Sequence, residues 1–254
     1  MIKKIIAIAG LAVLLPASSF AYWGINLKGG VSPVNHTDHE NEMNYQASHS
    51  NYNYWFYEKG PDRCPSAGAE LFFEGNGKNR LGLSAGWKAI GLAGPTLREE
   101  DSANVLLDLK NSAVAIPVTL YWKHKADNSK VALWLGAGAD YMKTKTQWTV
   151  VASGDIIDLI QSKIVPHADA GIEWYIFKKV SLGINLGYLF GAKFEELKGT
   201  HNGTDVQLYT VPRAIGREIL LAGSKPAGAK SYVQDWSGLR GDLALRVYFG
   251  GPSK

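Results

Sequence analysis

The sequence has a single cysteine, no dense block of charge and, beyond its first residues, no long apolar run. Because Cys64 is alone among 254 residues, an internal disulfide is excluded. We expect an unreactive loop thiol there, with intermolecular pairing as the alternative. The net charge is only +4 and no basic stretch reaches five or six residues, so no nucleic-acid partner is expected.

The one apolar run, Ile5 to Leu15, lies at the N-terminus and follows Lys3-Lys4. A basic start, a short apolar run and a small-x-small motif, here Ser19-Phe20-Ala21, are typical of a secretory signal peptide. The run is shorter than the ~20 residues that a membrane-spanning helix needs. We therefore predict that residues 1–21 are a cleaved signal peptide and that residues 22–254 form one domain.

What the sequence does contain is a period-two alternation that keeps one face of each segment free of charge. Near the C-terminus the uncharged face carries Leu239, Gly241, Leu243, Leu245, Val247 and Phe249, and the other face carries Arg240, Asp242, Arg246 and Tyr248. Segments of about ten residues with this alternation are the signature of a transmembrane β-barrel. A closed barrel has no unpaired backbone edge, so it can lie in lipid without an apolar helix.

Eight such segments lie along the chain, at about 22–31, 67–74, 80–88, 114–122, 133–141, 168–176, 180–190 and 239–249. The connections near 75–79, 123–130 and 177–179 are short, whereas those at 33–66, 91–112, 144–163 and 191–237 are long. Outer-membrane barrels alternate short periplasmic turns with long outer loops. We predict an all-β, antiparallel, up-and-down transmembrane barrel of about eight strands, with both termini on the periplasmic side.

Two features favour lipid, rather than a soluble lipocalin-like core, on the uncharged face. The charged face is rich in glycine, which suits a crowded interior better than a solvated surface. Aromatic residues gather at both ends of the uncharged stripes, as they do at the two membrane interfaces. One belt contains Trp23, Phe73, Trp122, Trp174 and Phe249, and the other contains Trp87, Tyr141, Tyr188 and Phe190.

Two stretches, Ala115 to Tyr121 (AIPVTLY) and Leu135 to Tyr141 (LGAGADY), give the chain a family resemblance. The mature chain resembles the small eight-stranded outer-membrane barrels, such as the OmpA transmembrane domain and its OmpW-like and OmpX-like relatives. The resemblance implies a cell-surface protein of the Gram-negative outer membrane, in contact with outer-membrane lipid and lipopolysaccharide and with the assembly machinery. Such proteins commonly end on an aromatic residue, whereas here Phe249 is followed by five further residues.

The inward face carries charges of both signs. A barrel of about eight strands is just wide enough for side chains to fill, and buried charges must be paired. We predict a mutually neutralising interior network, with Lys28 paired to Glu70 and Glu74 paired to Arg80, rather than a catalytic constellation. The network comprises Lys28, Glu70, Glu74, Arg80, Lys88, Asp140, His167, Asp169, Glu173, Arg240, Asp242 and Arg246.

The first long connection is rich in potential ligands but has no fixed ligand spacing. Its imidazoles and carboxylates are His36, Asp38, His39, Glu40, Glu42 and His49. Such groups can bind a divalent metal, but a polar loop explains the composition equally well, so neither a metal nor another cofactor is predicted. The aromatic run from Asn51 to Tyr57 suits a contact surface.

These patterns favour a structural or surface-interaction protein that acts through its outer loops toward a ligand that the sequence does not identify. A narrow channel for small or apolar solutes is the alternative, and it rests on the OmpW-like resemblance alone. A lipid A-modifying enzyme or a protease is the weakest hypothesis. The segment His36-Thr37-Asp38-His39 and the serines flanking His49 match no catalytic signature, so no enzyme is predicted.

Overall fold

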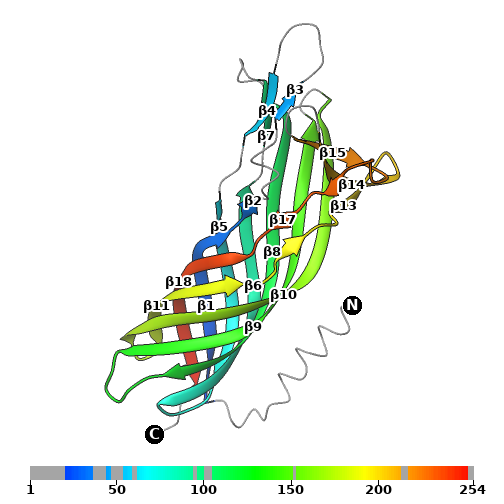
Figure 1. The fold of residues 1–254 in the computed structure, drawn as a ribbon. Helices are drawn as coiled ribbons and strands as arrows, with labels where there is room; N and C mark the ends of the chain where they lie inside the picture. The colour runs from blue at the N-terminus through cyan, green and yellow to red at the C-terminus, as the bar shows by residue number, and fades with distance from the viewer. Residues whose placement is uncertain are drawn as a thin grey trace.

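Eight long strands close into a ring in the computed structural model, which describes residues 21–36, 44–46, 54–58, 62–93, 96–99, 105–150, 153–212 and 217–250. The ring strands are β1 (Tyr22–Pro33), β5 (Arg63–Glu74), β6 (Asn79–Ala93), β8 (Val105–His124), β9 (Val131–Val150), β10 (Asp155–Phe177), β11 (Val180–Leu189) and β18 (Gly238–Gly250). Each pairs antiparallel with its neighbours in this order, and β18 pairs with β1 to complete the barrel in Figure 1. The predicted eight-stranded antiparallel barrel is confirmed.

The ring strands present apolar residues outward and polar residues inward. Leu243, Ile184 and Leu135 expose 67, 61 and 60% of their surface, whereas Arg240 and Asp242 are buried. Outward aromatic residues lie at both ends of the apolar band, with Trp23, Trp122 and Trp174 toward the short turns and Trp87 and Tyr188 toward the other end. This is the facing that the alternation predicts for a barrel in lipid. None of the described residues forms a helix long and apolar enough to cross a membrane.

Three short turns lie together at one end of the barrel. They join β5 to β6, β8 to β9 and β10 to β11, at residues 75–78, 125–130 and 178–179. Gly77 adopts a φ of 92° and Asn128 a φ of 58°, the left-handed conformation that glycine and asparagine tolerate best. The Lys125 amide donates to the Lys78 carbonyl at 2.8 Å, so neighbouring turns are joined through the backbone.

Two connections that the sequence predicts as loops are largely strand. Strand β8 begins at Val105 inside the expected loop 91–112, and β9 and β10 pair continuously through the expected loop 144–163, leaving residues 151–154 between them. The alternation continues there with its polarity reversed. Leu109 and Leu159 are buried, whereas Lys145 and Asp158 face outward and pair at 2.6 Å. A charge-free stripe marks only the lipid-facing length of a strand. The alternation therefore did not predict the parts of β8, β9 and β10 that extend beyond that length.

We call the part of β8–β10 beyond this reversal the outer extension. The nine residues that follow Tyr141 in β9 rise about 30 Å at the usual spacing of a strand. Figure 1 shows the green strands β9 and β10 continuing past the ends of β1 and β18. The extension encloses its own apolar core, which contains Leu107, Leu109, Trp148, Ile157, Leu159, Leu197, Leu208, Ile219 and Tyr232.

The remaining strands are short and belong to the connections at the outer end. They are β2 (Asn35–His36), β3 (Asn44–Gln46), β4 (Tyr54–Glu58), β7 (Thr96–Glu99), β12 (Lys193–Phe194), β13 (Lys198–His201), β14 (Thr204–Pro212), β15 (Arg217–Ala222), β16 (Lys230–Ser231) and β17 (Gln234–Asp235). Strands β13 to β16 form an arm that joins β10 at the pair Ile160–Lys198. Strands β12, β17 and β2 form a separate small sheet.

Cys64 is not the loop residue that the sequence analysis expects. It lies in β5 and is fully buried, opposite Ser32 of β1. Within the described part of the chain it packs in an apolar cluster with Val34 and Ile90. The predicted signal peptide, residues 1–21, falls almost wholly outside the described residues, as does the tail after Gly250.

Candidate functional site in the barrel lumen

The lumen near the short turns holds a compact ionic cluster. Lys123, which has no exposed surface, bonds to Glu74 and lies 2.8 Å from Glu173. Arg246 Nη1 approaches Glu173 Oε2 at 2.7 Å, and Arg80 Nη1 approaches Glu74 Oε2 at 3.3 Å. Each buried carboxylate therefore has two cationic partners, one of which is shared.

Two ion pairs lie higher in the lumen. Lys28 Nζ donates to Glu70 Oε1 at 2.5 Å, and Asn26 donates to the other oxygen of the same carboxylate at 3.1 Å. Lys88 Nζ donates to both oxygens of Asp242 at 2.9 and 3.1 Å. The Lys28–Glu70 and Glu74–Arg80 pairs expected from the sequence are both present, and the Lys88–Asp242 pair joins two strands distant in sequence, β6 and β18.

A second ionic cluster is built around Arg240 on β18. Its guanidinium contacts Asp140 at 2.8 Å and Asp169 at 3.0 Å. His167 lies between the same carboxylates, with Nδ1 2.7 Å from Asp140 and Nε2 3.3 Å from Asp169. Thr119 Oγ1 lies 3.0 Å from His167 Nε2. Hydroxyl, imidazole and carboxylate thus occur in the order used by nucleophilic enzymes.

The described lumen is close to electrically balanced. It contains six basic side chains, Lys28, Arg80, Lys88, Lys123, Arg240 and Arg246, and six carboxylates, Glu70, Glu74, Asp140, Asp169, Glu173 and Asp242. Each of these twelve lies within 4 Å of an opposite charge, which is the condition for keeping charges out of water. The predicted network differs from this set in that it contains His167 and lacks Lys123. All twelve of its residues lie on the inner face of the ring.

An apolar layer closes the lumen on the outer side of these clusters. The connection between β11 and β18 turns inward, so that Phe194 and Trp236 are fully buried against Met142 and Val165. Trp236 Nε1 donates to Thr144 Oγ1 at 3.2 Å. We call β12 and β17, together with Ala192 and Trp236, the plug. Two short parts of the connection 191–237 therefore lie inside the barrel, although the sequence predicts this connection as an outer loop.

Little space remains among the charged side chains. A cavity of about 10 Å³ lies beside Lys28, Glu70, Thr119, Trp134 and Arg246. That is close to the smallest volume that holds one water molecule. Thr119 and His167 are 4 and 2% exposed. A substrate therefore has no space next to the hydroxyl–imidazole–carboxylate arrangement.

The central cation, Lys123, is not among the residues predicted for the network. The sequence places it in the turn 123–130, although Trp122 faces outward and the residue after it must face inward. The alternation places Tyr248 on the charged face, as observed, but neither Tyr248 nor Tyr121 is among the predicted network residues, because an uncharged residue gives no signal in a charge pattern. Tyr121 donates to Glu74 at 3.0 Å, and Tyr248 bonds to both Glu173 and Lys123.

Most of the ligand-rich first connection lies outside the described residues. Of its candidate ligands only the backbone of His36, in β2, is described. No group of three or more histidine, cysteine, aspartate or glutamate side chains that could hold a metal occurs in the part of the chain that the structure describes.

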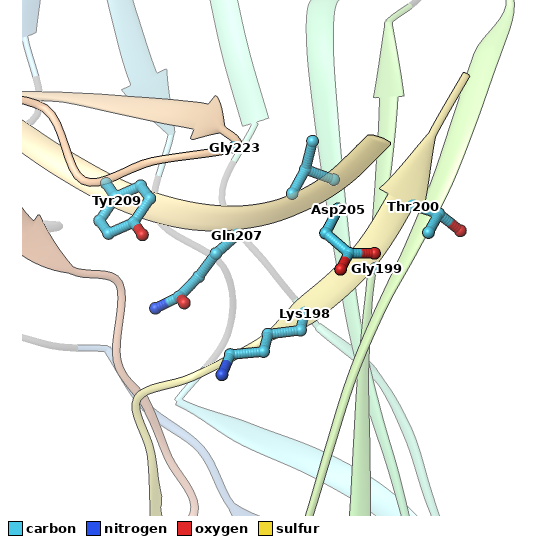
Figure 2. Close-up of a pocket in the computed structure, with 8 residues that line it drawn as sticks. Lys198, Gly199, Thr200, Asp205, Gln207, Tyr209 and Gly223 are labelled. Carbon is cyan, nitrogen blue, oxygen red and sulfur yellow. The ribbon is translucent and has the colours of Figure 1, made fainter. Parts of the chain in front are cut away.

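An open pocket of about 540 Å³ lies on the arm of the outer extension, between β13 and β14. Figure 2 shows Lys198, Asp205 and Gln207 lining it. Lys198 pairs with Glu196 at 3.1 Å, and both side chains are more than 60% exposed. The pocket is therefore a solvated surface hollow without converging buried polar groups.

No family model and no curated protein sequence matches the chain. Several solved structures are similar in fold. Neisserial surface protein A is 10% identical with a TM-score of 0.39, and the comparison covers 90% of this chain and 97% of that one. Ail, the attachment invasion locus protein of Yersinia pestis, is 13% identical with a TM-score of 0.43 and coverages of 91 and 99%. The outer membrane protein OprG of Pseudomonas aeruginosa is 11% identical with a TM-score of 0.42 and coverages of 91 and 98%.

At these levels of similarity the class of this chain rests on its own structure, an eight-stranded barrel with an apolar outer band. The more specific resemblance to OmpA-like, OmpW-like and OmpX-like proteins stays a prediction.

Proposed function

We propose that the protein is an outer-membrane barrel that acts as a structural or surface-interaction protein, and that it neither conducts solutes nor catalyses a reaction. The observation that carries this proposal is the double closure of the lumen. Charged pairs fill its lower and middle parts, and the apolar plug lies across its outer end. The strand-built outer extension has its own core, which suits a rigid platform for binding on the outer side.

The outer membrane is the location that best suits such a chain. Proteins that span the outer membrane are typically closed barrels with short turns on one side and longer connections on the other. Outer-membrane lipid, lipopolysaccharide and the assembly machinery are then the expected partners, and an N-terminal signal peptide would supply the export route.

The enzyme hypothesis would need a substrate at Thr119 and His167, and the burial of both residues argues against it. The channel hypothesis would need a continuous column of water past two closures. The hydroxyl–imidazole–carboxylate arrangement is the one described feature of the lumen that points to either hypothesis, and it is enclosed.

Conductance in a planar bilayer tests this proposal directly. The purified barrel should give no stable porin-like current steps, and at most rare small openings. Opening the lumen would separate buried charges such as Lys123 and Glu173 from their partners. A general porin inserted by the same protocol is the control for insertion and detection. Frequent, large and uniform steps from this protein would overturn the proposal and support the channel.

A further inference from the structure

The short turns at one end of the barrel form a basic surface. Residues 75–78, 125–130 and 178–179 contain five lysines and one aspartate. We call these lysines, Lys78, Lys125, Lys130, Lys178 and Lys179, the short-turn rim. Lys78, Lys130, Lys178 and Lys179 are exposed and Lys125 is half-buried. The single acid of these turns, Asp127, pairs with Lys78, so among the described residues the other four lysines have no acidic partner.

The rim is one continuous surface because backbone hydrogen bonds join the turns and strand ends around it. Lys125 N–H donates to the Lys78 carbonyl at 2.8 Å, and Tyr175 N–H donates to the Lys130 carbonyl at 2.7 Å. Tyr248 N–H donates to the Lys179 carbonyl at 2.9 Å. The lysines are therefore fixed around one end of the barrel rather than spread over separate mobile loops.

The lysines lie directly next to the apolar band. Trp122 and Trp174 face outward just above the turns, at 44 and 57% exposure. Phe177 comes immediately before Lys178 and is 69% exposed, the highest value among the exposed large apolar side chains of the described residues. An exposed aromatic residue beside Lys178 and Lys179 suits a membrane interface, where the ring contacts the acyl boundary and the ammonium groups reach the headgroups.

Distance also favours a lipid over a more remote polyanion. The turns have two to six residues, so they hold the lysines near the end of the apolar band. Interactions between exposed charges are strongly screened beyond a Debye length of about 8 Å at physiological ionic strength. Anionic headgroups lie within that range, whereas a cell-wall polymer begins beyond the headgroup layer.

We propose that the short-turn rim binds the anionic phosphate headgroups of the adjacent membrane leaflet, with Phe177 as its apolar anchor. The rim would thereby fix the depth of the barrel in the bilayer and select an acidic phospholipid annulus at this end. The inference rests on the membrane insertion proposed above. It is independent of whether the lumen conducts.

Lipid selectivity measured by electron paramagnetic resonance tests the rim. The mature full-length chain is folded into phosphatidylcholine vesicles that contain a trace of spin-labelled phosphatidylglycerol or spin-labelled phosphatidylcholine. The protein should associate with phosphatidylglycerol at least about threefold more strongly, since basic residues near an anionic surface add measurable attraction. The preference should decline as salt is raised.

The decisive variant replaces the four lysines without an acidic partner, as Lys125→Gln, Lys130→Gln, Lys178→Gln and Lys179→Gln, and its preference should fall to about one. A matched control removes four positive charges from the outer extension and its arm, as Lys110→Gln, Lys145→Gln, Lys198→Gln and Lys230→Gln. It should keep the preference of the unmodified protein. If the four-lysine variant folds poorly, the double variant Lys178→Gln/Lys179→Gln should lose about half of the preference.

A heat-dependent shift in gel migration reports insertion and closure separately, so a failure to insert is distinguishable from a loss of selectivity. Equal losses in the rim variant and the control would overturn the proposal, because net charge alone would then explain the effect. So would a preference abolished by inorganic phosphate but not by sodium chloride at equal ionic strength, which would indicate a site for the free ion. Rim-dependent sedimentation with purified peptidoglycan, without lipid selectivity, would reassign the rim to the cell wall.

Discussion

Lys123 shows how the lumen holds a charge away from water. Its ammonium group bonds to Glu74, lies 2.8 Å from Glu173 and donates to Tyr248 Oη at 2.8 Å. Three acceptors from three other strands therefore satisfy its three donors. A buried ion pair of this kind adds little net stability by itself, but removing one member leaves its buried partners with too little opposite charge.

We therefore expect Lys123→Met to destabilise the barrel by about 3–5 kcal/mol, because Glu74 and Glu173 each lose a cation while they stay buried. Urea unfolding in lipid vesicles, followed by tryptophan fluorescence, measures the loss. Lys198→Met, the same change at an exposed position of the arm, should stay within about 0.5 kcal/mol. Comparable stability in the two variants would contradict the role assigned to Lys123.

Charge alternation placed the predicted network residues on the inner face, because in a strand the side-chain direction follows from position alone. It could not supply most of the partners. The Lys88–Asp242 contact and the Arg240 cluster join residues that lie 71 to 154 positions apart in the sequence. Such pairings depend on the shear and closure of the ring, which a single sequence does not state.

Strand β18 illustrates the same rule at the scale of one element. Leu245 faces outward and pairs with Leu27 and Leu182, whereas Ala244 faces the lumen and is 3% exposed. Adjacent positions of the strand thus lie in two different environments. The predicted strands were accurate wherever one face meets lipid, and too short in β8, β9 and β10, where the outward residues become lysine, aspartate and serine.

For the same reason Leu245→Arg should block assembly, since an arginine on the lipid face near the midplane costs about 2–4 kcal/mol. Ala244→Ser, one position away, should assemble normally. The yield of heat-modifiable protein in the outer-membrane fraction compares the two variants. Equal tolerance of both changes would show that the assigned facing of β18 is wrong.

The whole molecule consists of two stacked parts with opposite polarity. The lower part is polar inside and apolar outside, and the outer extension is apolar inside and mostly polar outside, with Ile156 and Ile160 as exposed exceptions. The long strands β8, β9 and β10 run through both parts, so the same sheet suits lipid along its lower part and water along its outer part. The cores are separate, because the extension packs around Leu159 and Tyr232 whereas the lower part is held by ion pairs.

Leu159→Ala should therefore loosen the outer extension and leave the lower barrel intact. Deleting a buried leucine side chain costs about 2–5 kcal/mol, and that loss falls on a part without lipid support. Limited proteolysis of the folded protein should become faster in the extension, while the heat-dependent gel shift persists. Ile184→Ala, on the lipid face, is the matched control and should leave proteolysis unchanged. Loss of the gel shift in Leu159→Ala would contradict the separation of the two cores.

The closing strand has a consequence for biogenesis. Arg240, Asp242 and Arg246 all come from β18, and their partners Asp140, Asp169, Lys88 and Glu173 come from strands made earlier. Until β18 pairs with β1 and β11, Asp140, Asp169, Lys88 and Glu173 lack these salt-bridge partners, and the ring lacks the hydrogen bonds that close it. A chain that ends before its last strand would then have two defects, an open sheet edge and uncompensated charge in the lumen, and each would disfavour stable insertion.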